Sequence, residues 1–294
     1  MRSGANILEQ LSLGVLDYGP QLGSTLQLIP IAERSGYRRF WLTEHFPSVH
    51  GSALAMAGIA AAMSNRITVG TGGILLRYHV PYVAAQTFRA LSSLWPGRIE
   101  AGFCAGGVAR PLRRELAPFV GDASYPRRVE ELVALTRNQR GGDGNRPPLI
   151  AHPDTVQPPS LWYLGSGDNG ASIAARLGVC FGFALHFRHC RDNPDIVDRY
   201  RQEFVSDDLQ ESPRCCLSVG FFCSESQSEV DKVVRQNEQT PLLPLVLGRP
   251  LECREQLEAL ADRYQLDEIL LLNLSPQPVV QQRSFQLLGE EVTR

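Results

Sequence analysis

Short apolar segments recur along the chain at a spacing of roughly 30 residues, the length of one strand–helix–strand unit. The stretches between them have the apolar spacing of helices. Strands joined through helices run parallel, and eight such units can close into a barrel. The pattern therefore predicts one α/β domain over residues 1–294, a (β/α)8 TIM barrel. The eight strands are expected at 11–16, 39–43, 67–70, 98–103, 161–165, 180–185, 215–223 and 268–272.

The expected helices begin and end at residues that suit helix ends. Ser24 and Ser52 are expected to cap the first two helices, Gly36 to end the first, and Pro81 to begin the third. Together with these three, the apolar spacing predicts later helices at 126–140, 169–178, 194–205, 256–264 and 278–288.

Two alternatives to a single barrel arise from the sequence. The Gly/Pro-rich stretch 141–159 could separate two domains, but the even spacing of the strands favours a long surface loop. A doubly wound open sheet would need a Gly-rich phosphate turn after its first strand, and residues 17–20 (DYGP) are not one.

Composition and charge exclude several classes of function. The formal net charge is −2 and no run of Lys or Arg occurs, so we expect neither nucleic-acid nor membrane-surface binding. No stretch of 18 apolar residues and no signal-peptide pattern is present, so we expect no membrane span. Seven scattered cysteines without a C-x-x-C pair suit reduced thiols in a cytoplasmic protein.

Four segments, in this order, resemble the bacterial luciferase-like family of flavin-dependent oxidoreductases and monooxygenases. The second is the most specific, because a strand, a Gly-Gly step, a Pro-anchored helix and a PGRI turn fall in register. The resemblance implies a (β/α)8 barrel, usually dimeric, that binds reduced flavin mononucleotide (FMN) or, in a sister branch, a deazaflavin at its carboxyl-end mouth. The segments are SGYRRFWLTEHF (35–46), ITVGTGGILLRYHVPYVAAQTFRALSSLWPGRIEAGF (67–103), LWYLGSGDNGASIAARLG (161–178) and GRPLECREQLEALADRYQLDEILLL (248–272).

The resemblance assigns a role to the end of the second strand. In the family, the position of His45 holds a histidine that acts as general acid/base on the flavin or its oxygen adduct, which suits an imidazole near neutral pH. The alternative is a histidine that only hydrogen-bonds a strand end. Glu44 is expected at the cofactor. Phe46 stands where many members carry a second histidine, so the two-histidine arrangement is absent and Phe46 is expected to line the substrate.

Two turns are candidate flavin sites by the same resemblance. Gly72 and Gly73 stand where the family has a small-residue pair, often joined by a cis peptide, whose backbone lies against the isoalloxazine ring. Ser166, Gly167 and Asn169 begin a helix whose amides could cradle the phosphate. The alternatives are a simple Gly-Gly turn and an Asp/Asn helix cap; if phosphate binds, Asp168 should point away.

Cys104 ends the fourth strand, at a position where luciferase carries a reactive thiol near the flavin; simple packing is the alternative. The next position often holds an Arg that pairs with the phosphate, and here it is Ala105. Arg77 and Arg110 are the possible substitutes. We therefore expect FMN to be held less tightly than in a typical member.

His79 and His186 follow strand ends and are expected to line the substrate site, with His189 nearby. No histidine pair has the spacing of metal ligands, and no G-x-S-x-G elbow of a serine hydrolase occurs. We therefore expect neither a metal site nor triad hydrolysis.

The family's long lid segment after the seventh strand is reduced here to 225–249. A shortened lid predicts a more open mouth, a cover supplied by a partner, or lost catalysis. The small-residue helix at 53–63 predicts a homodimer, because the family dimerises there.

The function expected from all this is a flavin-dependent monooxygenase or related oxidoreductase. It would act on a small-molecule or carrier-bound organic substrate with O2 and reduced FMN from a separate flavin reductase, since no nicotinamide fingerprint occurs. The alternatives are a deazaflavin-dependent hydride-transfer enzyme and a non-catalytic flavin-binding or subunit-like barrel.

Overall fold

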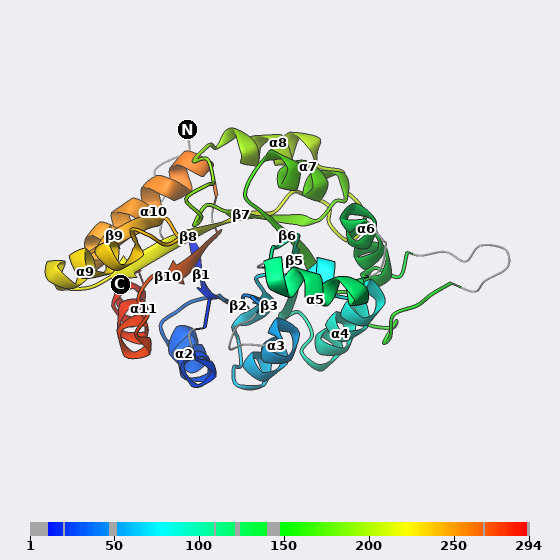
Figure 1. Ribbon diagram of the computed structural model, residues 1–294, viewed down its shortest axis with the longest axis horizontal. Coiled ribbons are helices and arrows are strands. Elements are labelled where there is room, and N and C mark those ends of the chain that lie inside the picture. The colour runs from blue at the N-terminus through cyan, green and yellow to red at the C-terminus, as the bar shows by residue number, and fades with distance from the viewer. Residues whose placement is uncertain are drawn as a thin grey trace.

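The computed structural model describes residues 11–19, 21–46, 52–108, 110–120, 124–139, 148–266 and 268–292. Its centre is a closed barrel of eight parallel strands, in which β10 pairs with both β1 and β8 (Figure 1). All eight strands coincide with the apolar segments of the sequence, so the predicted TIM barrel is confirmed. The strands are β1 (Ser12–Asp17), β2 (Arg39–Leu42), β3 (Thr68–Thr71), β5 (Ile99–Cys104), β6 (Ser160–Gly165), β7 (Cys180–Ala184), β8 (Cys215–Cys223) and β10 (Glu268–Asn273).

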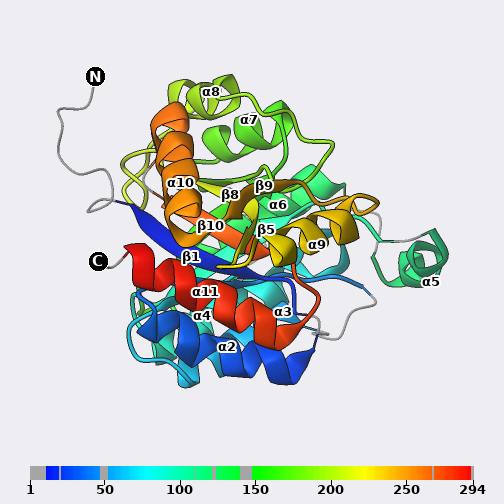
Figure 2. The ribbon, with the colours of Figure 1, turned by 90° about the vertical axis from the view of Figure 1, so that its left-hand side faces the viewer.

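Helices surround the barrel, and each of the eight expected from the sequence is present. Figure 2 shows the closing helix α11 between α10 and α2, so that the last unit packs on the first. The outer helices are α2 (Leu22–Arg34), α3 (Ala53–Ala62), α4 (Pro81–Leu94), α6 (Tyr125–Thr136), α7 (Asp168–Arg176), α8 (Asp195–Glu203), α10 (Pro250–Tyr264) and α11 (Pro278–Val292). The sequence pattern missed α5 (Arg110–Val120), α9 (Gln227–Asn237), β4 (Ile74–Leu75), the 3₁₀ turn η1 (Leu76–Tyr78) and β9 (Pro244–Gly248).

The helix ends confirm the expected places of Ser52, of Pro81 at the start of α4 and of Gly36 just after α2, and correct that of Ser24. Ser52 caps α3, since its Oγ accepts a hydrogen bond from the amide of Ala55 at 3.3 Å. Ser24 does not cap α2. The helix begins after Gln21, and the Ser24 hydroxyl donates to the Gln21 carbonyl at 2.7 Å inside the first turn. The start of α7 carries no side-chain cap, because its N-cap residue is a glycine.

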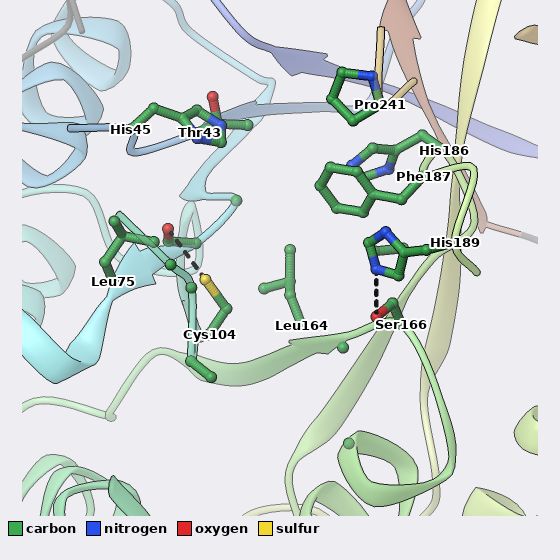
Figure 3. Close-up of a pocket in the computed structure, with 18 of the residues that line it drawn as sticks. Thr43, His45, Leu75, Cys104, Leu164, Ser166, His186, Phe187, His189 and Pro241 are labelled. Carbon is green, nitrogen blue, oxygen red and sulfur yellow. Dashed lines mark hydrogen bonds between the residues drawn. The ribbon is translucent and has the colours of Figure 1, made fainter. Parts of the chain in front are cut away.

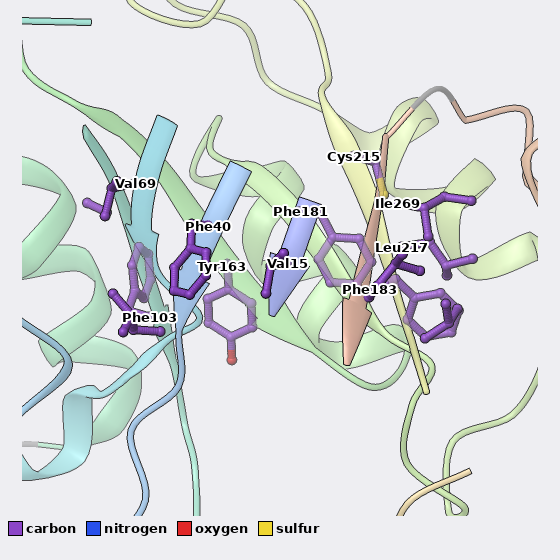
Figure 4. Packing of buried hydrophobic residues seen from close by; sticks show 14 of the residues in the cluster. Val15, Phe40, Val69, Phe103, Tyr163, Phe181, Phe183, Cys215, Leu217 and Ile269 are labelled. Carbon is purple, nitrogen blue, oxygen red and sulfur yellow. The ribbon is translucent and has the colours of Figure 1, made fainter. Parts of the chain in front are cut away.

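The buried core has two parts. Between the strands and the helices lies the large apolar cluster of Figure 4, which includes Phe40, Phe103 and Phe181. Inside the barrel, the rings of Trp41 and Trp162 meet edge to face with centroids 5.1 Å apart. A barrel filled by side chains in this way is a packed core and leaves no channel through its centre.

Charged side chains close the amino end of the barrel. Arg39, near the start of β2, is buried and pairs with Glu100 of β5 at 3.0 Å and with Glu268 of β10. Trp41 Nε1 also donates to Glu100 at 2.6 Å. Because this end is occupied by a paired cluster, a ligand site is left to the carboxyl end.

The described part of the Gly/Pro-rich stretch, 148–159, runs over the outside of the barrel. Arg89 of α4 donates hydrogen bonds to the carbonyls of Pro153 at 2.8 Å and Val156 at 3.0 Å, and also to Thr136 of α6 at 2.7 Å. These bonds hold the segment against two barrel helices, as a surface loop would be held. No helix in the described ranges is both long and apolar enough to cross a membrane.

Candidate active site

A cavity of about 1050 Å³ lies at the carboxyl ends of the strands (Figure 3). This is the end of a TIM barrel at which enzymes of this fold place their active sites. Its walls come from the carboxyl ends of the strands and the segments that follow them. They are Tyr18 after β1, Thr43 to His45 after β2, Gly72, Gly73 and Leu75 after β3, Cys104 to Gly107 at the end of β5, Tyr163 to Gly170 from β6 into α7, Ala184, His186, Phe187 and His189 at the end of β7, Thr240 to Leu242 before β9, and Leu272 of β10.

Most of the residues chosen from the sequence meet in this cavity. They are Glu44, His45, Gly72, Gly73, Cys104, Ser166, Gly167, Asn169 and His186. Phe46 and His79, expected to line the substrate, are not among the residues that line this cavity. Phe46 instead packs edge to face on Tyr78, and the His79 ring is turned to Glu44.

His45 and His186 stand on opposite sides of the cavity (Figure 3). The half-buried His45 ring lies beside Tyr18, with ring centroids 4.5 Å apart. Tyr18 was not singled out from the sequence, although its place directly after a strand end was the available signal. His45 reaches the cavity from β2, where a general acid/base could exchange a proton with a bound ligand.

The contacts of Ser218 favour one tautomer of His186. The Ser218 hydroxyl lies 3.3 Å from the Phe183 carbonyl, to which it can donate, and 2.9 Å from His186 Nδ1. When the hydroxyl donates to the carbonyl, it accepts from Nδ1, and Nε2 keeps its lone pair. Burial lowers the pKa of His186 from its ordinary 6.5 to about 4, and the nearby His45 and His189 act in the same direction. His186 is thus a neutral hydrogen-bond acceptor near pH 7.

Glu44 is a buried carboxylate in the cavity wall, 2% exposed. Its Oε2 accepts from the amide of Leu75 at 2.8 Å and lies 2.7 Å from His79 Nε2. Its Oε1 has no hydrogen-bond partner among the described residues. The His79 carbonyl in turn accepts from Arg128 Nη1 at 2.8 Å.

The wall between β3 and β4 is bare backbone. The peptide bond between Gly72 and Gly73 is cis. A Cβ on Gly73 would lie 2.7 Å from the Phe103 amide nitrogen, and one on Gly72 would lie 2.5 Å from Leu16 Cδ1. Neighbouring atoms therefore exclude any side chain at either position, and a planar ligand could approach this backbone closely.

The turn from β6 into α7 presents hydrogen-bond donors to the cavity. Ser166 Oγ lies 3.4 Å from His189 Nε2, and a Cβ on Gly167 would meet nothing within 4 Å. The first amides of a helix have no partner within the helix and favour an anion. Asp168 also lines the cavity, and its carboxylate pairs with Arg199 of α8 at 2.9 Å.

The thiol of Cys104 faces the carbonyls of Ile74 at 3.6 Å and Gly73 at 3.8 Å. Burial, with the charge of Glu44, raises the pKa of Cys104 to about 12. The group therefore stays a protonated thiol, a weak nucleophile, and the packing interpretation fits it better than the reactive one.

Neither proposed substitute for the missing phosphate arginine reaches the cavity. The Arg77 guanidinium lies over the Tyr125 ring at 5.6 Å, and Arg110 is exposed on α5. Among the described residues that line the cavity there is neither Arg nor Lys. The basic groups there are the imidazoles of His45, His186 and His189. Within the described ranges, no cluster of three His, Cys, Asp or Glu side chains could hold a metal ion.

The shortened segment after β8 forms a fixed wall of the cavity. Leu242 makes an antiparallel bridge with Phe187, and the Leu243 amide donates to the His186 carbonyl at 2.7 Å. The Arg188 amide donates to the Pro241 carbonyl at 2.8 Å, and its guanidinium donates to the Thr240 carbonyl at 3.0 Å. The loop after β7 thus holds residues 240–243 in place as part of the cavity wall. This differs from the more open mouth that the shortened segment predicted.

Fold and cavity together define a TIM-barrel protein with a cavity at its carboxyl-end mouth. The chain belongs to the luciferase-like monooxygenase family, which matches residues 1–269. A luciferase-like monooxygenase of Escherichia coli K12 is 28% identical over 85% of this chain and 76% of its own length.

Solved structures agree with this assignment. The crystal structure of apo-MsnO8 is 28% identical, with a TM-score of 0.84 over 96% of this chain and 98% of that one. The oxygenating constituent of 3,6-diketocamphane monooxygenase from Pseudomonas putida, solved in complex with FMN, has a TM-score of 0.73 over 96% of this chain and 98% of its own. At 13% identity, that second likeness concerns the fold alone.

Proposed function

We propose that this protein is a flavin-dependent monooxygenase that uses O2 and reduced FMN, delivered by a separate flavin reductase, to oxidise a small-molecule or carrier-bound organic substrate. One observation carries the proposal. The side-chain-free backbone of Gly72 and Gly73 and the amino end of α7 line the same cavity. A planar ring and a phosphate, the two ends of FMN, would each find a suitable surface there.

The residues present fit the cofactor. Gly72 and Gly73 would lie against the ring, and Ser166 with the amides of Gly167 and Asn169 would bind the phosphate. When bound, reduced flavin would supply the electrons that activate O2. The cavity volume of about 1050 Å³ leaves room for an organic substrate beside the cofactor.

Other side chains of the cavity would have separate roles in the reaction. His45 would donate and accept the proton, since it reaches the cavity from β2. His186 would orient a hydroxyl or N–H of the substrate with its unprotonated Nε2. Leu164, Phe187 and Leu242 supply apolar surface that excludes water from the reacting atoms.

A homodimer through α3 and α4 belongs to the same proposal. Gly58 lets the two helices approach closely, since a Cβ there would lie 3.2 Å from Leu91 Cδ2. Ile59 and Met63 at α3 remain 44% and 42% exposed, and Val83 of α4 is 57% exposed. Apolar side chains exposed on adjacent helices are typical of a protein contact.

Anaerobic titration tests the proposal. Purified protein is mixed anaerobically with reduced FMN or a reduced deazaflavin, and binding is measured. The protein–ligand complex is then assayed for oxygen consumption in the presence of reductase and candidate substrates. Binding of reduced FMN with substrate-dependent oxygen uptake supports the monooxygenase. Binding of the deazaflavin alone would favour a hydride-transfer enzyme, and binding of neither would favour a non-catalytic barrel.

A further inference from the structure

His186 presents an unused hydrogen-bonding atom to the cavity. The residue is 6% exposed, and its Nδ1 lies 2.9 Å from the Ser218 hydroxyl. Its Nε2 has no hydrogen-bond partner among the described residues, and it is not one of the unpartnered atoms that they seal from solvent. Because His186 lines the cavity, a bound molecule can reach this nitrogen. Buried polar groups are nearly always hydrogen-bonded, so a ligand that pairs with Nε2 completes the arrangement.

The neighbours of His186 decide which kind of partner Nε2 takes. In the 3.3 Å contact between Ser218 Oγ and the Phe183 carbonyl, only the hydroxyl can donate. This favours the tautomer in which Nδ1 donates to Ser218 and Nε2 keeps its lone pair. Burial lowers the pKa of His186 to about 4, so the ring stays uncharged near pH 7. Nε2 therefore selects a ligand that carries a hydroxyl or N–H donor.

Aromatic rings line both sides of the space beside His186. The ring centroid of the half-buried Phe187 lies 4.2 Å from that of His186 and 5.3 Å from that of the exposed His189. Figure 3 shows His45 across the cavity from this group, and the ring centroid of Tyr18 lies 4.5 Å from that of His45. All five side chains line the cavity. A flat ring between such walls can stack on them or meet them edge to face, which favours an aromatic ligand over a saturated one of the same size.

The cavity offers little charge to a substrate. Among the described residues that line it there is neither Arg nor Lys, and two carry carboxylates. Glu44 accepts from the Leu75 amide with Oε2, and its Oε1 is enclosed by protein. Asp168 already pairs with Arg199 of α8 at 2.9 Å. A charged group that leaves water needs an opposite charge to replace its hydration, so the cavity favours an uncharged substrate.

These observations together define a class of substrate. Resting on the proposed function, we propose that the substrate is an uncharged aromatic molecule whose hydroxyl or N–H group donates to Nε2 of His186. His186 is then the residue that selects the substrate and fixes one edge of its ring. The ring itself lies between His186 and His45, the group proposed to exchange the proton. The backbone of Gly72 and Gly73 is left to the cofactor.

A purely structural role for His186 predicts something different. The ring would then only contact Ser218 and fill the wall, and its replacement would alter folding stability or the affinity for every ligand alike. His186→Phe separates the two interpretations, because a phenyl ring fills the same space without a nitrogen. In this variant the Ser218 hydroxyl keeps the Phe183 carbonyl as a partner. His152→Gln, at a side chain that is 60% exposed on the outer loop, is the matched control.

The experiment measures the affinity of bicyclic probes by equilibrium dialysis at about pH 8, with the protein saturated by oxidised FMN. 2-Naphthol has the aromatic ring and the donor, 2-fluoronaphthalene lacks the donor, 2-decalol lacks the aromatic ring, and 2-naphthoate carries a negative charge. 2-Naphthol should bind more tightly than 2-decalol or 2-naphthoate. His186→Phe should weaken 2-naphthol about tenfold, the loss of one hydrogen bond, and leave 2-fluoronaphthalene unchanged. His152→Gln should change neither affinity.

The possible failures are distinguishable. If His186→Phe weakens 2-naphthol and 2-fluoronaphthalene equally, Nε2 does not select the substrate. If 2-decalol or 2-naphthoate binds as tightly as 2-naphthol, or no probe binds, the substrate class is wrong. In each of these cases the protein still binds FMN. Failure of the unaltered protein to bind FMN would instead refute the proposed function.

A second measurement uses the unaltered protein. Nitrogen NMR of the histidine rings distinguishes a protonated from an unprotonated ring nitrogen. Near pH 7, Nε2 of His186 should be unprotonated, and its resonance should move when 2-naphthol is added but not when 2-fluoronaphthalene is added. A protonated Nε2, or the same movement with both probes, would overturn the assignment.

Discussion

The buried imidazole of His186 should make the folding stability of this protein depend on pH. Its pKa is lowered from 6.5 to about 4 in the folded protein, chiefly because burial disfavours the charged form. Between these two values, the unfolded chain binds a proton that the folded protein does not bind. Stability is therefore greatest above pH 6.5 and falls as the pH is lowered towards 4.

The size of the effect follows from the two pKa values. Between pH 7 and pH 5 the difference in proton binding costs about 2 kcal/mol of the free energy of unfolding. His186→Gln removes the titration while its side chain can still hydrogen-bond Ser218. Between pH 7 and pH 5, the free energy of unfolding should thus fall by about 2 kcal/mol less in the variant than in the parent.

Urea unfolding at pH 7 and pH 5 measures the difference directly. His152→Gln is the control, since that side chain is 60% exposed and should leave the pH dependence of the parent unchanged. If His186→Gln loses as much stability as the parent between the two pH values, His186 is not the neutral buried group described, and its role as an acceptor for substrate fails with it.

Four other predictions can each be tested by one measurement. His45→Ala should lower turnover by roughly 10²–10⁴-fold in a reductase-coupled assay with little change in FMN affinity; unchanged turnover would leave His45 a structural role only. FMN should bind more tightly than riboflavin in equilibrium titrations, and Ser166→Ala should narrow that difference; equal affinities in the parent would show that no phosphate site exists there. Glu100→Gln should cost about 3 kcal/mol of unfolding free energy, because it leaves a buried guanidinium of β2 short of a partner, and calorimetry showing an unchanged melting temperature would argue against this. Light scattering at micromolar concentration should give a dimer that Ile59→Glu dissociates and Val279→Glu, on the 76% exposed position of α11, does not; a monomeric parent would refute the α3–α4 interface.

The strands could be predicted because each is a short, buried run with little competing pattern. β8, for example, is buried at every position, so its sequence is apolar on both faces. The segment between β8 and α10 could not be predicted in the same way. In α9 the buried residues Val230, Val233 and Asn237 do follow helical spacing, but they are few and stand among polar residues. β9 begins with Pro244 and pairs with β8 through a register shift, so its sequence is a short and irregular strand signal.

The site could be predicted where it depends on strand ends, and not where it depends on side-chain direction. Glu44, His45 and Cys104 reach the cavity because they end or follow barrel strands. His79 lies beyond the short turn η1, where its ring contacts Glu44 and its carbonyl contacts Arg128, and it does not line the cavity. Such contacts join segments distant in sequence, so a local pattern does not reveal them.

A crystal structure of the protein with bound FMN tests the central claim most directly. The account predicts that the isoalloxazine ring lies against the backbone of Gly72 and Gly73, with the phosphate at Ser166 and the first amides of α7. A ring bound elsewhere, or a phosphate held by Arg77 or Arg110, would contradict it.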